Sequence, residues 1–198
     1  RLEEGGVRVF LLEDGVVEKV ADASTPQPII ASVRMPISSL VDVQPTGTLI
    51  VLHDVRDPGN VGTIIRSADA SGATAVILTG HSVDPFNPKT LRATAGSVFH
   101  LPVVLHESIE EVLTWFHNAG GVSFATVVRN GENLDTIELP ANHLFVLGNE
   151  AEGLSDEAVE LATKGVTIPM TGRAESLNVS VAAALTLFAG QRSRHSLR

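Results

Sequence analysis

The sequence lacks cysteine altogether, and this absence excludes several kinds of chemistry at once. A chain without thiols forms no disulfide bond, no thiolate zinc site and no cysteine nucleophile, and it fits a reducing compartment. The sequence also lacks an apolar run of the roughly 18 residues that a membrane-spanning helix needs, and no signal peptide opens it. We therefore expect a cytoplasmic protein with no membrane partner.

Basic residues are also scarce, with 14 Lys and Arg against 23 Asp and Glu and a formal net charge of −9. Neutralising nucleic-acid phosphates needs clustered basic side chains, so this balance argues against a general nucleic-acid coat. A catalytic site needs only a local basic patch. The seven histidines show no paired spacing typical of a metal site, so we expect no metal.

The length of 198 residues is enough for one full domain and a fragment of another. The first residue is not methionine and precedes a strand-like run, so we expect a trimmed piece of a longer protein. Apolar runs predict strands at 7–12 and 28–33, with 15–20 pairing as a hairpin. They predict the remnant of a small α/β N-terminal domain and its linker at 1–45, with the linker at 35–46.

From residue 46 to 198 the pattern changes to alternating strands and helices. The predicted extended segments are 49–53, 75–78, 98–104, 122–127, 144–147 and 166–168. The predicted helices are 60–71, 88–95, 108–118, 156–163 and 176–190. Continuous apolar strands are typical of a parallel sheet that is buried on both faces. The alternation predicts a three-layer α/β sandwich with a mostly parallel sheet.

Three polar segments that contain glycine follow predicted strands. The first reads Asp57-Pro-Gly-Asn-Val-Gly62 and continues to Arg66. The second reads Gly148-Asn-Glu-Ala-Glu-Gly153, and the third reads Ile168-Pro-Met-Thr-Gly-Arg-Ala-Glu-Ser-Leu-Asn-Val-Ser180. Open α/β folds bind ligands at the carboxyl ends of their parallel strands, so we expect the three segments to form one site.

Residues of these segments also have structural interpretations. Asn60 can cap the predicted helix 60–71. Arg66 lies four residues after Gly62 on a face of small residues, and its partner is either a carboxylate, in a structural pair, or a phosphate. Glu150 can be a carboxylate at a surface turn. Capping explains a serine at the start of helix 176–190, but not why so apolar a helix keeps further polar residues in its first turn.

Taken together, the three segments resemble the signature motifs of the SpoU (TrmH-like) RNA methyltransferases, a family of the SPOUT superfamily. Their order and spacing agree with the family over residues 46–190, and residues 85–97 resemble its intervening segment. The resemblance implies a deep trefoil knot in the C-terminal part of the α/β domain, whose loops hold S-adenosylmethionine in a bent shape. It also implies a homodimer whose site lies close to the interface, where Arg66 acts within its own subunit or across the interface.

The functional positions of the family map onto individual residues of this chain. Those implied to bind the cofactor are Gly148, Ile168, Leu177, Thr126, Leu147 and Met170. Those implied to form the reaction site are Asn60, Arg66, Glu150, Ser176 and Asn178. Arg66, Lys89 and Arg92 are implied to line an RNA-binding groove.

The implied reaction transfers a methyl group from S-adenosylmethionine to a ribose 2′-hydroxyl of structured RNA. A guanidinium has no acceptor lone pair, so we expect Arg66 to stabilise developing alkoxide charge or to hold a substrate phosphate that takes the proton. Asn60 is expected to position Arg66 or the ribose, and Glu150 is expected to orient Arg66 or Asn60.

The resemblance leaves several functions open. The N-terminal remnant resembles that of ribosome-modifying members, including the thiostrepton-resistance type, which favours ribosomal over transfer RNA as the substrate. The alternatives are a tRNA 2′-O-methyltransferase, a base methyltransferase, and a knotted module that binds RNA or the cofactor without catalysis.

Overall fold

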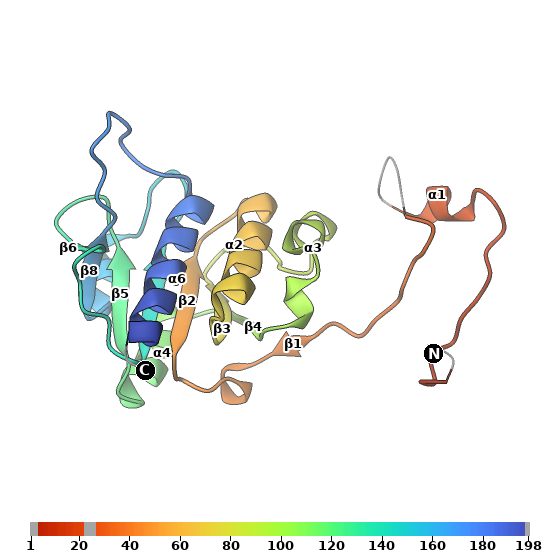
Figure 1. Cartoon of the computed structure of the whole chain (residues 1–198), viewed down its shortest axis with the longest axis horizontal. Helices are drawn as coiled ribbons and strands as arrows, with labels where there is room; N and C mark the ends of the chain where they lie inside the picture. Colours follow the sequence, from red (N-terminus) through yellow and green to blue (C-terminus); the bar gives the residue numbers. More distant parts are fainter. Residues whose placement is uncertain (1–3, 22–26, 197–198) are drawn as a thin grey trace. The chain divides into compact units, whose positions relative to one another are not determined.

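The computed structural model describes residues 4–21 and 27–196 of the chain (Figure 1). The chain divides into two compact units, Arg1–Met35 and Pro36–Arg198. Among the described residues, no helix combines the length and the apolar character that crossing a bilayer requires.

In the described residues of the first unit, the only regular element is the short helix α1 (Val16–Val20). The strands predicted at 7–12 and 28–33 are therefore wrong, and the predicted hairpin strand at 15–20 is α1. Leu11 is 100% exposed. An apolar run becomes a strand only where another strand satisfies its backbone N–H and C=O groups, and the described residues provide no such partner.

The second unit contains an eight-stranded sheet in the order β1-β4-β3-β2-β7-β5-β8-β6. Every pairing in this sheet is parallel, which confirms the mostly parallel sheet expected from the sequence. The strands are β1 (Ile37–Ser38), β2 (Thr48–His53), β3 (Ala75–Thr79), β4 (Val103–His106), β5 (Val122–Thr126), β6 (Glu132–Asn133), β7 (His143–Leu147) and β8 (Lys164–Thr167).

Helices cover both faces of the sheet, so the three-layer arrangement is confirmed. On one face lie α2 (Pro58–Ser71), α3 (Pro88–Thr94) and α6 (Val179–Ser196), and on the other lie α4 (Ile109–Asn118) and α5 (Asp156–Leu161) (Figure 1). The alternating directions of side chains in β2 explain the two cores. Ile50 and Leu52 pack with residues of α2 and α6, whereas Leu49 and Val51 pack with residues of α4.

Two predicted segments differ from the structure. The predicted linker 35–46 lies almost entirely in the second unit, because β1 pairs with β4 and the 3₁₀ helix Leu40–Asp42 follows it. The predicted extended segment 98–104 is divided into the 3₁₀ helix Ser97–Phe99 and the strand β4. In both places the backbone conformation changes within a few residues, which residue pattern alone does not show.

Candidate functional site

The first polar segment forms the turn from β2 into α2. The carboxylate of Asp57 caps α2 by accepting the backbone N–H of Asn60 at 2.8 Å, and Pro58 occupies the first turn. The expectation that Asn60 caps the helix is therefore wrong. Because Asp57 takes this role, the amide side chain of Asn60 is free to contact other segments.

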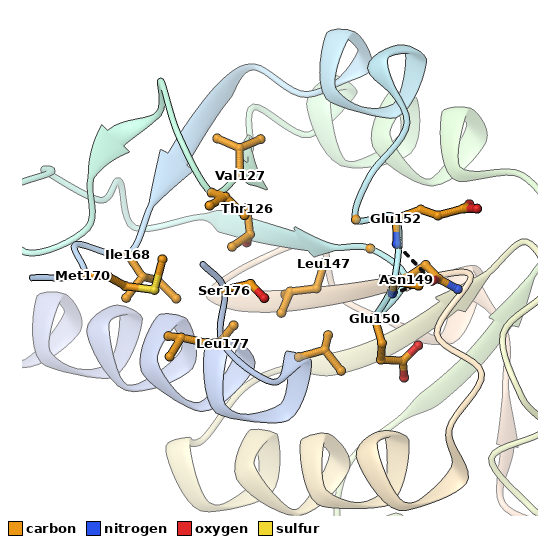
Figure 2. Close-up of a pocket in the computed structure, with 16 residues that line it drawn as sticks. Thr126, Val127, Leu147, Asn149, Glu150, Glu152, Ile168, Met170, Ser176 and Leu177 are labelled. Atoms are coloured by element: carbon orange, nitrogen blue, oxygen red, sulfur yellow. Dashed lines mark hydrogen bonds between the residues drawn. The ribbon is translucent and has the colours of Figure 1, made fainter. Parts of the chain in front are cut away.

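The second polar segment is a tight turn after β7. Backbone hydrogen bonds join Asn149 and Gly153 in both directions, at 3.0 and 2.9 Å. A Cβ at Gly148 would collide with the backbone of Gly153, and Gly153 itself has a φ of 74°. Both glycines are thus required by backbone geometry, and the turn presents the Glu150 side chain toward α2 (Figure 2).

The third polar segment leads into α6, which begins at Val179 rather than at the predicted Ser176. The side chain of Asn178 produces this later start, because its Oδ1 accepts the backbone N–H of Ser180 at 2.8 Å and its hydroxyl at 2.6 Å. Ser176 lies before the helix and is exposed, and its side chain has no hydrogen-bond partner among the described residues.

A chain of hydrogen bonds joins the three segments. Asn178 Nδ2 donates to Asn60 Oδ1 at 3.1 Å, and Asn60 Nδ2 donates to Glu150 Oε1 at 3.1 Å. The same carboxylate oxygen also lies 3.4 Å from the backbone N–H of Asp57. The structure therefore brings Asn60 together with Glu150 and Asn178, which follow it in the sequence by 90 and 118 positions.

The two ends of this series of hydrogen bonds determine which atom of each amide donates and which accepts. The backbone N–H of Ser180 only donates, so Asn178 must present its oxygen there. The ionised carboxylate of Glu150 only accepts, so Asn60 must present its nitrogen. Each of the two amides then keeps one N–H that no described residue accepts, and both are available to a bound ligand.

A pocket of about 230 Å³ opens beside this chain of hydrogen bonds (Figure 2). It is bordered by the ends of β5 and β7, the turn after β7, the segment after β8 and the first turn of α6. All six residues expected to bind the cofactor line it, and so do Glu150 and Ser176 of the expected reaction site. Those six are Thr126, Leu147, Gly148, Ile168, Met170 and Leu177.

The wall of the pocket is largely apolar but contains unused polar groups. The hydroxyl oxygen of Thr126 is buried and has no hydrogen-bond partner among the described residues. The backbone N–H groups of Ile168, Met170 and Leu177 also find no acceptor within that part of the chain. A pocket wall that is apolar but offers unused polar groups suits a ligand with a flat apolar body and polar edges.

The three basic residues expected to bind RNA are exposed and lie on α2 and α3, outside the pocket wall. Arg66 pairs with no carboxylate among the described residues, so the structural Arg–Glu pair is not found there. Gly62 does not form part of a ligand face, because a Cβ there would collide with Ala93 and Thr90 of α3. Close packing of α2 against α3 therefore explains why residue 62 is a glycine. Lys89 and Arg92 lie on α3 beside this contact.

Sequence reasoning missed two residues of this edge. Asn149 Nδ2 donates to the backbone carbonyl of Asp54 at 3.0 Å, which ties the turn after β7 to the end of β2. The only signal in the sequence was the position of Asn149 inside the second segment. The described residues contain no group of three or more His, Asp or Glu that could hold a metal ion.

Comparison with known proteins gives a consistent set of similarities. The model of the family described as "SpoU rRNA Methylase family" matches residues 47–188. The chain is 36% identical over 189 residues to the 23S rRNA (guanosine(2553)-2′-O)-methyltransferase RlmP of Bacillus subtilis, covering 93% of this chain and 73% of that protein. It is 33% identical over 202 residues to the 23S rRNA (adenosine(1067)-2′-O)-methyltransferase of Streptomyces laurentii, covering 98% of this chain and 73% of that protein.

Solved structures agree with the curated relatives. The SpoU methyltransferase AviRb from Streptomyces viridochromogenes, in complex with the cofactor AdoMet, superposes with a TM-score of 0.75 at 36% identity, covering 82% of this chain and 67% of that one. The AdoMet-bound rRNA methyltransferase from Sinorhizobium meliloti superposes with a TM-score of 0.72 at 40% identity, covering 79% of this chain. The match spans 60% of the Sinorhizobium chain.

Proposed function

Because the chain belongs to the SpoU rRNA methylase family, we propose that it transfers a methyl group from S-adenosylmethionine to a ribose 2′-hydroxyl of structured RNA. Ribosomal RNA is the favoured substrate, since the relatives from Bacillus and Streptomyces laurentii are named as 23S rRNA methyltransferases. The observation that carries the proposal is that Glu150 lines the pocket and also accepts the hydrogen bond from Asn60. Glu150 thus connects the wall of the pocket to the hydrogen-bonded side chains of Asn60 and Asn178.

The residues of the pocket fit S-adenosylmethionine. Apolar side chains of Leu147, Ile168 and Leu177 suit the faces of an adenine ring, and the unused N–H groups and the Thr126 hydroxyl suit its polar edge. Among the described residues that line the wall, only Glu150 and Glu152 are charged, and their negative charge suits a sulfonium. When bound, the cofactor supplies an activated methyl group.

The residues beside the pocket would then position the ribose and its charge. The remaining N–H groups of Asn60 and Asn178, together with the hydroxyl of Ser176, can bind the sugar and hold its 2′-oxygen in line with the methyl group. Glu150 orients Asn60, and the support for this role is the hydrogen bond between them. The exposed guanidinium of Arg66 stabilises the alkoxide that develops as the hydroxyl loses its proton to solvent water, or it holds a substrate phosphate that takes this proton. Lys89 and Arg92 on the neighbouring helix contact the RNA backbone.

We further propose that the C-terminal part of the domain forms a deep trefoil knot. The support is that the turn 148–153 and the segment 168–177 border one pocket, although α5 and β8 separate them in the chain. Residues 1–45 are proposed to belong to an RNA-binding N-terminal domain and its linker.

A homodimer is also part of the proposal. Val181, Leu185 and Phe188 form an apolar stripe along α6 and are 47%, 43% and 38% exposed. A second copy of the chain is the proposed cover for this stripe. α2 and α6 lie side by side on the same face of the sheet (Figure 1), so Arg66 would lie near the interface. Mixed dimers of Arg66→Ala and Asn60→Ala subunits test whether Arg66 acts across it, because only action across the interface restores one complete site.

Calorimetric titration with S-adenosylmethionine, followed by methyl incorporation into ribosomal RNA transcribed in vitro, tests the proposed enzyme. Binding together with incorporation is the expected result. Binding without incorporation into ribosomal or transfer RNA would instead identify a non-catalytic cofactor-binding module. Incorporation into transfer RNA alone would show that the substrate is transfer RNA rather than ribosomal RNA.

A further inference from the structure

Asp54, which directly follows β2, has a φ of 58°. Few residues with a Cβ adopt this left-handed conformation, and aspartate does so where its short side chain finds hydrogen-bond partners. Non-glycine residues in this conformation cluster at functional sites. Asp54 lies three residues before Asp57, the residue that starts α2 and the first polar segment.

Hydrogen bonds from two neighbouring strand ends hold Asp54 in place. Its Oδ1 accepts the backbone N–H of His81, after β3, at 2.6 Å. Its backbone carbonyl accepts the side-chain Nδ2 of Asn149, after β7, at 3.0 Å. Gly80 leaves room for the carboxylate, since a Cβ there would collide with Asp54 Oδ1. The carboxyl ends of β3, β2 and β7, which are adjacent in the sheet, are thereby fastened together.

The side-chain oxygen of Asn149 stabilises the turn after β7. Its Oδ1 accepts the backbone N–H of Ala151 at 2.8 Å and lies 3.4 Å from that of Glu152 (Figure 2). Asn149 therefore uses its oxygen to hold the turn and its nitrogen to dock the turn onto β2. The next residue in the chain is Glu150, whose carboxylate accepts from Asn60.

These contacts form a closed ring. Asp54 is followed in the polypeptide by Asp57 and Asn60, and both of these donate hydrogen bonds to Glu150 Oε1. Glu150 directly follows Asn149 in the sequence, and the Asn149 side chain donates a hydrogen bond to the Asp54 carbonyl, which closes the ring. Glu150 is thus fixed relative to α2 from two sides. We propose that Asn149 is a positioning residue that sets the distance between Glu150 and Asn60 through its hydrogen bond to Asp54. This inference rests on the methyl transfer proposed above.

The substitution Asn149→Asp tests this role, because the carboxylate keeps the acceptor for the turn but loses the donor to the Asp54 carbonyl. Asn142→Asp is the matched control. It introduces the same charge before β7, at the opposite end of the strand, and keeps the oxygen that accepts Gly47 N–H at 3.0 Å. We expect Asn149→Asp to lower kcat by up to about 100-fold, the loss that a displacement of about 1 Å at a reaction site can cause. Equal kcat values for the two variants would overturn the proposal.

A double-mutant cycle separates positioning from general damage. If Asn149 acts through Glu150, then Asn149→Asp should lower kcat no further in a Glu150→Ala background. Losses that multiply would show that Asn149 acts by another route, and the proposal would fail.

A readout that does not depend on catalysis keeps the two proposals distinguishable. The side-chain amide signal of Asn60 reports its bond to Glu150. In nuclear magnetic resonance spectra we expect Asn149→Asp to shift this signal toward its position in Glu150→Ala, and Asn142→Asp to leave it in place. Absence of methyl transfer by the wild-type protein would refute the proposed function, whereas an unmoved Asn60 signal would refute the role of Asn149.

Discussion

The side-chain amide of Asn60, in the first turn of α2, donates to the carboxylate of Glu150 across 3.1 Å. This contact joins the first polar segment to the wall of the pocket. Because the carboxylate accepts from both Asn60 and the backbone N–H of Asp57, its charge and its position both contribute to the site.

Substitution of Glu150 separates these two contributions. Glu150→Ala removes the acceptor and should lower the methyl-transfer rate about 100-fold, the loss typical of a displaced catalytic group. Glu150→Gln keeps an oxygen that accepts from Asn60, and a neutral hydrogen bond is about half as strong as a charge-assisted one, so a loss of about 10-fold is expected. Single-turnover rates at saturating cofactor measure both. Equal rates for the wild type and Glu150→Ala would show that the contact has no role in the reaction.

Substitution of Asn178 tests which of its side-chain atoms donates and which accepts. Asn178→Asp keeps the oxygen that accepts from Ser180 but loses the nitrogen that donates to Asn60. The aspartate should therefore begin α6 as well as asparagine does, and the free energy of unfolding should stay close to that of the wild type. Its methyl-transfer rate should nevertheless fall as far as that of Asn178→Ala. A rate near that of the wild type would contradict the assigned direction.

Thr126 tests the fit of the pocket. Its buried hydroxyl lacks a partner among the described residues, and an unsatisfied buried polar group costs about 1–3 kcal/mol. Thr126→Val should therefore raise the free energy of unfolding without cofactor by about 1 kcal/mol. The same change should weaken S-adenosylmethionine binding about 5- to 10-fold, because the bound ligand loses one hydrogen bond. Denaturant unfolding and calorimetry measure the two effects. Unchanged affinity would show that the hydroxyl does not bind the cofactor.

His117 gives the fold a dependence on pH. Its Nε2 lies 2.7 Å from the hydroxyl of Ser123, and burial lowers the pKa of His117. The unfolded chain therefore takes up a proton near pH 6.5 while the folded chain stays neutral, and the free energy of unfolding falls as the pH drops below that value.

His117→Gln removes this titration, so it should lose less stability than the wild type between pH 7.5 and pH 5.5 in urea unfolding. The other histidines contribute equally to both proteins. Parallel loss of stability in the two proteins would refute a pH-dependent contribution from His117.

The sequence was sufficient to predict the sheet and much of the site for a physical reason. Strands such as β2 are buried on both faces and read as unbroken apolar runs, so they stand out from amphipathic helices such as α4. The polar residues after these strands had no packing role to explain them. The residues expected to bind the cofactor, Thr126 and Gly148 among them, line one pocket.

Other features depend on contacts between distant segments and could not be predicted locally. The run 7–12 has strand-like composition, but the described residues of its unit provide no strand to pair with it. Asp57 and Asn60 are both suitable caps for α2, and only the backbone geometry shows that Asp57 takes the position. The contact of Asn149 with Asp54 spans 95 residues and follows from the pairing of β2 with β7.

Alkaline hydrolysis of RNA that this protein has labelled from methyl-tritiated S-adenosylmethionine tests the account most directly. A methyl group on the 2′-oxygen blocks cleavage of the adjoining phosphodiester, so we expect the label in alkali-stable dinucleotides. Arg66→Lys, which loses the planar guanidinium but keeps the charge, should release the same product more slowly. Label found only in mononucleotides would place the methyl group on a base and contradict methylation of the ribose.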